Sequence, residues 1–114
     1  MIDTELDALA RRVGVALAAR GWRLATAESC TGGWIAAAVT AIGGSSAWFD
    51  RGFVTYSNEA KMDMLGVCAQ TLAEHGAVSE ATVCEMAEGA LARSLADVTV
   101  AVSGVAGPTG GTAA

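Results

Sequence analysis

Residues 22–42, WRLATAESCTGGWIAAAVTAI, contain the succession of signals that decides the fold. Residues 22–28 alternate loosely between apolar and polar side chains, which predicts a strand. The short turn Ser-Cys-Thr-Gly-Gly follows, and residues 34–42 are then apolar on every side, which predicts a buried helix. A strand that leads through a glycine turn into a helix is typical of layered α/β proteins.

The segments on either side of this stretch continue the alternation of helix and strand. The sequence predicts a helix over residues 4–20, a short helix that is capped by Asn58 and ends at Leu65, and a helix from Ser79 to about Leu95. It predicts strands over residues 48–57 and 98–102. Residues 67–78 carry no strong signal and are expected to be a connection with at most one helical turn. We therefore expect one α/β domain over residues 1–114, which breaks off after the glycine-rich loop 104–112.

Charge and composition exclude several classes of protein. The 114 residues carry a formal net charge of −5 and only seven scattered basic residues. Phosphate backbones are bound by clustered Lys and Arg, so nucleic-acid binding is disfavoured. No apolar run approaches the roughly 20 residues of a membrane helix, and the acidic N-terminus is unlike a signal peptide, so we expect a cytoplasmic protein. Three dispersed cysteines and one histidine form no metal-ligand pattern.

Polar or glycine-rich sequence follows each of the three predicted strands. These segments are Glu28–Gly33, Tyr56–Asn58 and Ser103–Thr112. Ligands of α/β sheets bind at the carboxyl ends of strands, so we expect these segments to converge on one site.

Ser29 lies where the first strand turns toward a helix. Backbone N–H groups at a helix start are unpaired, so they could bind a phosphate or stabilise the oxyanion of an acyl-transfer intermediate. Gly32 and Gly33 would let a ligand approach the backbone closely. The alternative is that Ser29 only caps the helix and the glycines only aid packing. Cys30 is adjacent and could compete with Ser29 as the nucleophile.

Lys61 is the candidate base for a serine nucleophile. The single histidine, His75, lies in a polar connection and is expected at the surface. A lysine acts as a base only when burial or a positive field lowers its pKa. Tyr56 ends the preceding strand and could relay a proton or hold the serine hydroxyl. The alternative is a solvated Lys61 and a half-buried Tyr56.

Three segments in this order and at these distances resemble the CinA C-terminal domain family. They are TAESCTGG at residues 26–33, VTYSNEAK at 54–61 with LGV at 65–67, and SGVAGPTGGT at 103–112. The segment GAVSE at 76–80 is also similar. The resemblance covers nearly the whole chain and implies a three-layer α/β/α fold with a mixed sheet. Domains of the family continue beyond the glycine loop with another strand and helix, whose loss would leave an open sheet edge.

The resemblance also implies an activity, the hydrolysis of nicotinamide mononucleotide to nicotinate mononucleotide and ammonia. It assigns the catalytic roles to Ser29, Tyr56 and Lys61. It implies that a substrate with a ribose phosphate is held by the glycine loops and the turn, namely Cys30, Thr31, Gly32, Gly33, Gly104, Gly107, Thr109, Gly110 and Gly111. We expect no metal or organic cofactor, a small pyridine nucleotide as partner, and a homo-oligomer.

Two other functions remain open from the sequence. One is a non-catalytic module that binds a nucleotide or a partner in the same pocket. The other is phosphoryl chemistry on the glycine loops, which is disfavoured because the pattern G-x-x-x-x-G-K-[ST] is absent.

Overall fold

Helices and strands alternate along residues 4–105, the part of the chain described by the computed structural model. In chain order the elements are α1 (Thr4–Arg20), β1 (Leu24–Glu28), α2 (Trp34–Thr40), the short 3₁₀ helix η1 (Ser45–Ala47), β2 (Phe49–Val54), α3 (Asn58–Leu65), α4 (Ala69–His75), α5 (Glu80–Ala92) and β3 (Val98–Val102). The three strands lie where the sequence predicts them.

The strands form one sheet in the order β2-β1-β3, and all three run parallel. In this register Glu28 at the end of β1 is level with Val54 of β2 and Val102 of β3. The carboxyl ends therefore meet at one edge of the molecule. Because the described strands are all parallel, the antiparallel strand of the expected mixed sheet is not found within residues 4–105.

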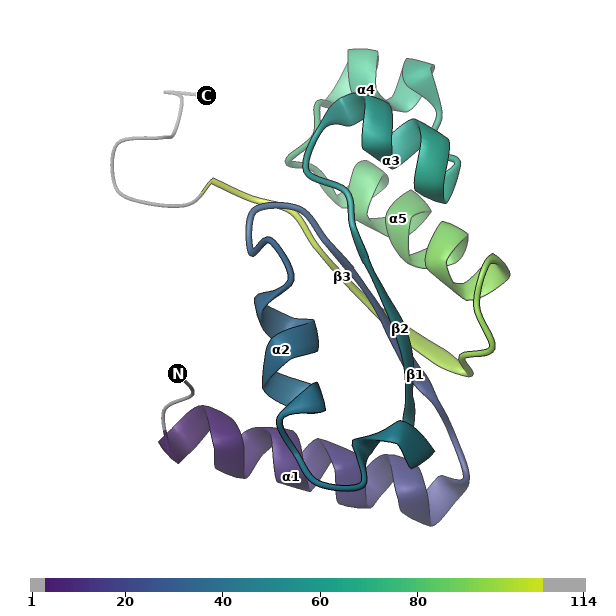
Figure 1. Ribbon diagram of the computed structural model, residues 1–114. Coiled ribbons are helices and arrows are strands. Elements are labelled where there is room, and N and C mark those ends of the chain that lie inside the picture. Colours follow the sequence, from purple (N-terminus) through teal and green to yellow (C-terminus); the bar gives the residue numbers. More distant parts are fainter. Residues whose placement is uncertain (1–3, 106–114) are drawn as a thin grey trace.

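Helices cover both faces of the sheet, which confirms the predicted layered α/β fold. Figure 1 shows α1 and α2 on one side of the strands and α3, α4 and α5 on the other. Each side has its own core. Leu17, Leu24 and Trp48 belong to the core on the α1 side, and Leu65 and Met86 belong to the core on the α5 side. Burial of these apolar surfaces is the dominant favourable contribution to folding.

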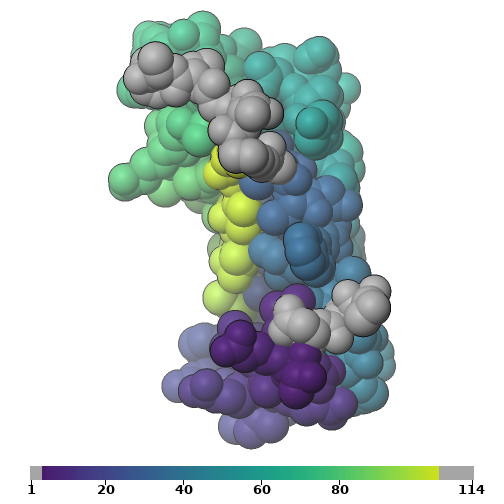
Figure 2. All heavy atoms as spheres, turned by 90° about the vertical axis from the view of Figure 1, so that its left-hand side faces the viewer, coloured from purple at the N-terminus to yellow at the C-terminus, as the bar shows by residue number. Residues whose placement is uncertain are grey.

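β3 lies at one edge of the sheet and pairs only with β1 among the described residues. Its atoms form a strip of the molecular surface beside α2 and above α1 (Figure 2). The side chain of Val100 is 43% exposed. This side of the sheet is therefore open in the part of the chain that the structure describes.

The prediction that the helix at residues 34–42 is buried on every side is wrong. Only Ala38 and Val39 are buried in α2, whereas Trp34 is 60% exposed. The helix contacts α1 and the sheet with one face only, and no described element covers the opposite face. An apolar composition therefore did not mean burial on all sides.

The connection predicted over residues 67–78, with at most one helical turn, contains a seven-residue helix, α4. The side chain of Cys68, its N-cap residue, forms no capping hydrogen bond. The helix start is instead held by Glu85 of α5, whose carboxylate accepts hydrogen bonds from the Cys68 amide at 2.8 Å and from Thr71 Oγ1 at 2.6 Å. Because Glu85 is distant in sequence, no local signal indicated this helix.

Candidate active site

Ser29 follows the last residue of β1 and is held there by the sheet. Its amide donates a hydrogen bond of 3.1 Å to the carbonyl oxygen of Val102, and the residue is 7% exposed. The chain then turns through Gly32 and Gly33, which have φ angles of 61° and 103°. These left-handed values favour glycine over any residue with a Cβ. The glycines are thus explained by the turn that follows the serine.

Lys61 reaches the serine from α3. Ser57 caps this helix by accepting a 3.0 Å hydrogen bond from the Ala60 amide, so Ser57 and not the predicted Asn58 is the N-cap. The cap places Lys61 in the first turns of α3, where it faces β1. The lysine is 1% exposed, and its Nζ lies 3.0 Å from Ser29 Oγ. The structure therefore brings the candidate nucleophile and base into direct contact.

Two carbonyl oxygens complete the surroundings of the Lys61 amine. Its Nζ donates to the carbonyl of Thr55 at 3.0 Å and to that of Tyr56 at 3.2 Å. Burial lowers the pKa of Lys61, and the neighbouring Cys30 opposes this by raising it. A neutral amine has two N–H groups and one lone pair. If both N–H groups of the neutral form donate to the carbonyls, its lone pair is left to accept the hydroxyl proton of Ser29.

Tyr56 takes part through its backbone. Its carbonyl oxygen accepts from Lys61 Nζ and lies 3.5 Å from Ser29 Oγ. The side chain is 75% exposed, which is more than the half-buried position considered from the sequence. The phenol forms no hydrogen bond within residues 4–105. Tyr56 therefore contacts Lys61 and Ser29 through its carbonyl oxygen in this structure, and its ring borders the pocket.

A pocket of about 390 Å³ opens over the pair. It is lined by Ser29, Cys30, Tyr56, Asn58, Lys61, Ala77, Val78, Ser103, Gly104 and Val105. All three strand ends contribute to this lining. Lys61 is its only basic side chain among the described residues, and no carboxylate lines it. Two exposed apolar side chains, Val78 at 56% and Val105 at 49%, lie in this lining beside the polar side chains of Tyr56 and Asn58. The pocket therefore offers both apolar and polar contacts beside the serine.

The convergence predicted from the sequence did not include one of the lining segments, residues 77–78. Ala77 and Val78 come from the loop before α5, and Ser103 fixes this loop by donating a 2.8 Å hydrogen bond to the Ala77 carbonyl. The segment at residues 76–80 was noted only for its resemblance to the family. His75, two residues earlier, has a 54% exposed side chain and lies outside the pocket, as expected.

The predicted binding residues are distributed over different places. Cys30 and Gly104 line the pocket. Gly32 and Gly33 form the turn and do not line it. Thr31 borders a different hollow. Gly107, Thr109, Gly110 and Gly111 lie outside the described residues.

The start of α2 is already occupied by an anion from the chain itself. The carboxylate of Glu28 accepts hydrogen bonds from the amides of Ile35 and Ala36, each at 2.9 Å, and from Thr31 Oγ1 at 2.6 Å. These two amides are therefore not available to a bound phosphate or oxyanion. The amides of Cys30 and Thr31 donate no hydrogen bond within the described part of the chain, so they remain able to contact an oxyanion.

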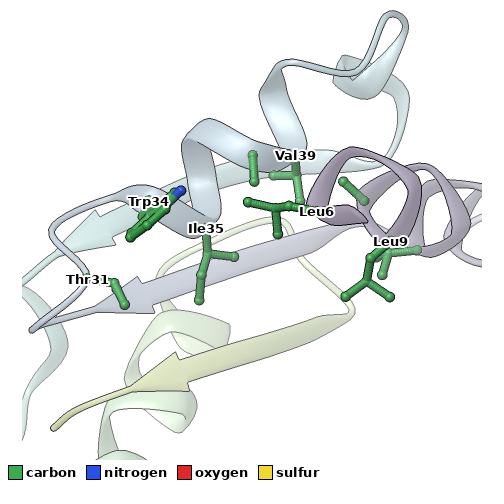
Figure 3. Close-up of a pocket in the computed structure, with 9 residues that line it drawn as sticks. Leu6, Leu9, Thr31, Trp34, Ile35 and Val39 are labelled. Carbon is green, nitrogen blue, oxygen red and sulfur yellow. The ribbon is translucent and has the colours of Figure 1, made fainter. Parts of the chain in front are cut away.

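A second hollow lies between α1 and α2 and is almost wholly apolar (Figure 3). Figure 3 shows Leu6, Leu9, Trp34 and Ile35 around it, with Thr31 at one end. The hollow contains no candidate nucleophile besides Thr31, whose hydroxyl is bound to Glu28. The serine pocket is therefore the better candidate for chemistry.

Residues 4–105 contain neither a cluster of metal ligands nor a membrane-spanning helix. No three His, Cys, Asp or Glu side chains gather there closely enough to hold a metal ion. None of the described helices has the length and apolar character needed to cross a membrane.

Comparison with known proteins gives one consistent family. The model of the CinA C-terminal domain matches residues 6–114. The chain is 63% identical over 111 residues to the nicotinamide-nucleotide amidohydrolase PncC of Escherichia coli strain K12, which covers 97% of this chain and 67% of that protein. It is 59% identical to a putative competence-damage inducible protein of Symbiobacterium thermophilum, covering 98% of this chain and 26% of that longer protein.

A solved structure has the same fold. The crystal structure of the competence/damage inducible protein CihA from Agrobacterium tumefaciens superposes with a TM-score of 0.95 at 55% identity. The match covers 99% of this chain and 68% of the other. The fold described above is thus that of a known group of proteins.

Proposed function

The chain belongs to the CinA C-terminal domain family, and on this premise we propose that it hydrolyses the carboxamide of nicotinamide mononucleotide through Ser29. The products are nicotinate mononucleotide and ammonia. The observation that carries the proposal is the 3.0 Å contact between Ser29 Oγ and the buried Lys61 Nζ. The name of the 63% identical relative, a nicotinamide-nucleotide amidohydrolase, supports this substrate.

The first half of the reaction is the acylation of the serine. Neutral Lys61 accepts the hydroxyl proton while Ser29 Oγ forms a bond to the carboxamide carbon. Lys61 then gives this proton to the departing nitrogen, the carbon–nitrogen bond breaks and ammonia leaves. The nicotinoyl group remains as an ester on Ser29. The carbonyls of Thr55 and Tyr56 keep the lysine lone pair aimed at the serine.

The second half releases the acid. Lys61 takes a proton from water, the oxygen of this water bonds to the ester carbon, and Ser29 leaves with the proton that Lys61 returns. In both halves we assign the developing oxyanion to the amide of Cys30, which lines the pocket. Ser29, Lys61 and water account for every bond and proton, so the proposal includes neither a metal nor an organic cofactor.

Binding of the nucleotide is assigned to the pocket and to the loop that leaves β3. The pyridinium ring would lie against Val78 and Val105 with the exposed ring of Tyr56 beside it. Gly104 lines the pocket and begins the glycine-rich loop, to which we assign the ribose phosphate.

The test is to trap the ester on the serine. The chain is mixed with nicotinamide mononucleotide, quenched in acid within the first turnovers and digested. Mass spectrometry is expected to find the nicotinoyl nucleotide adduct on the peptide that contains Ser29. An adduct on Cys30 instead, or turnover without any adduct and unaffected by Ser29→Ala, would refute the serine route.

A further inference from the structure

Glu28 is the residue immediately before the serine, and its carboxylate is buried. The residue is 1% exposed and forms no ion pair with any described cation. Burying a carboxylate is costly unless hydrogen bonds replace its water shell. Here both oxygens are bound, Oε1 by Thr31 Oγ1 and the Ile35 amide and Oε2 by the Ala36 amide. All three partners follow Ser29 in sequence. Thr31 lies within the turn, and Ile35 and Ala36 lie at the start of α2.

The partners of Glu28 explain why the charge is tolerated. The first amides of a helix have no partner within the helix and carry a partial positive charge. The carboxylate fills this position at the start of α2. It thereby ties the end of β1 to the start of α2 and closes the turn that contains Ser29.

The backbone of Glu28 is fixed on the opposite side. Its carbonyl oxygen accepts a 2.8 Å hydrogen bond from the amide of Thr55. The carbonyl of Thr55 in turn accepts from Lys61 Nζ. One residue therefore connects the serine turn, through its side chain, to α2 and, through its main chain, to the segment that holds the lysine.

We propose that Glu28 is a positioning residue for the acyl transfer, which fixes the turn so that Ser29 Oγ stays beside Lys61. This inference rests on the proposed function. Glu28 does not line the pocket, so it acts on the serine and not on the substrate. A displacement of about 1 Å between reacting groups can lower a rate by roughly 100-fold.

Glu28→Gln is the first variant, because it keeps the size of the side chain and removes the charge. The new amide group can accept from one side only, so at least one of its donor partners loses its bond. We expect kcat to fall by roughly 100-fold and KM for nicotinamide mononucleotide to stay within about twofold. The pH at which kcat/KM rises should not move, because Lys61 keeps its surroundings.

Thr31 supplies a matched pair that keeps Glu28 itself. Thr31→Val preserves the shape and removes the hydroxyl bound to Oε1, and the expected fall in kcat is on the order of tenfold. Thr31→Ser restores the hydroxyl and should restore most of kcat. A loss of the same size in both variants would indicate packing and would overturn the inference. This pair decides the question if Glu28→Gln does not fold.

Two further measurements separate this inference from the proposed function. Hydrogen exchange of the Ile35 and Ala36 amides should accelerate in Glu28→Gln, whatever the substrate. Labelling of Ser29 by a serine-directed fluorophosphonate should slow in Glu28→Gln and Thr31→Val. If the wild-type chain is labelled at Ser29 but releases no ammonia, nicotinamide mononucleotide is not its substrate. The labelling rates of Glu28→Gln and Thr31→Val then decide whether Glu28 positions Ser29. An active wild type with unchanged kcat in Glu28→Gln, or a shifted pH profile in that variant, would overturn the inference.

Discussion

The Nζ atom of Lys61 lies 3.0 Å from the Oγ atom of Ser29, although the two residues are 32 positions apart in the sequence. The contact exists because β1 and β2 are parallel neighbours, so their carboxyl ends lie side by side. Ser29 directly follows the end of β1, and Lys61 belongs to the helix that follows β2. The geometry of the sheet thus joins a serine and a buried amine, the two groups from which the proposed amidase chemistry is built.

The activity should rise with pH. The base is the neutral amine of Lys61, so kcat/KM increases as the pH passes upward through the Lys61 pKa and then levels off. Burial lowers this pKa, so the rise should lie below the value of about 10.4 that is usual for an exposed lysine. The measurement is kcat/KM for nicotinamide mononucleotide at a series of pH values over which the chain stays folded.

Lys61→Arg is the control for the pH profile. The guanidinium does not lose its proton, so activity should fall by about 10²- to 10⁴-fold at every pH. A chain that is equally active with arginine at this position would show that Lys61 is not the base.

Stability should depend on the same titration. The folded pKa of Lys61 is lowered and the unfolded one is ordinary, so the unfolded chain binds more protons between the two values. The free energy of unfolding therefore rises with pH across that window, and is lowest below the folded pKa. In Lys61→Met this part of the rise should disappear. Denaturant unfolding of both chains at several pH values measures the difference, and parallel curves would disagree with a lowered pKa.

The two possible roles of Tyr56 predict different kinetics. If the Tyr56 carbonyl orients Lys61, Tyr56→Phe keeps that carbonyl and the ring, so kcat should change by no more than about twofold. Tyr56→Ala removes the exposed ring that we place beside the pyridinium, which should raise KM by about two- to fivefold. A proton relay through the phenol would instead appear as a large loss of kcat in Tyr56→Phe.

The packing of α5 against the end of α3 should tolerate no side chain at Gly89. A Cβ atom there would overlap the carbonyl oxygen of Leu65, the last residue of α3. We expect Gly89→Ala to lower the free energy of unfolding by about 1–3 kcal/mol. Gly43→Ala is the matched control, because a Cβ at Gly43 meets no atom within 4 Å. Similar midpoints of urea unfolding for the two variants would contradict the close approach of these helices.

The layered fold and the meeting of the strand ends could be predicted from the sequence, because both depend on local patterns. Alternation and glycine turns located the three strands, and parallel strands carry their ends to one place. Features that depend on distant partners could not be predicted. The start of α4 depends on Glu85, which is 17 residues from Cys68. The exposure of Trp34 depends on which elements pack on α2, and its composition does not contain this information.

The residues of the candidate site could likewise be predicted only in part. Ser29 and Lys61 stood out because each follows a predicted strand. The task of Glu28 was not predicted, because its three hydrogen bonds form only when the turn folds back on α2. The participation of Tyr56 through its carbonyl was also missed, since residue identity gives no sign of a backbone role.

Ammonia release from nicotinamide mononucleotide, measured side by side for the chain and for Ser29→Ala, decides whether Ser29 is the nucleophile of an amidase. Ser46→Ala serves as the control, because Ser46 is exposed and lies in η1, outside the pocket. The account predicts that the wild type and Ser46→Ala release ammonia, and that Ser29→Ala is slower by about 10⁴-fold or more with an unchanged fold. Ammonia release by Ser29→Ala at the rate of the wild type would contradict it.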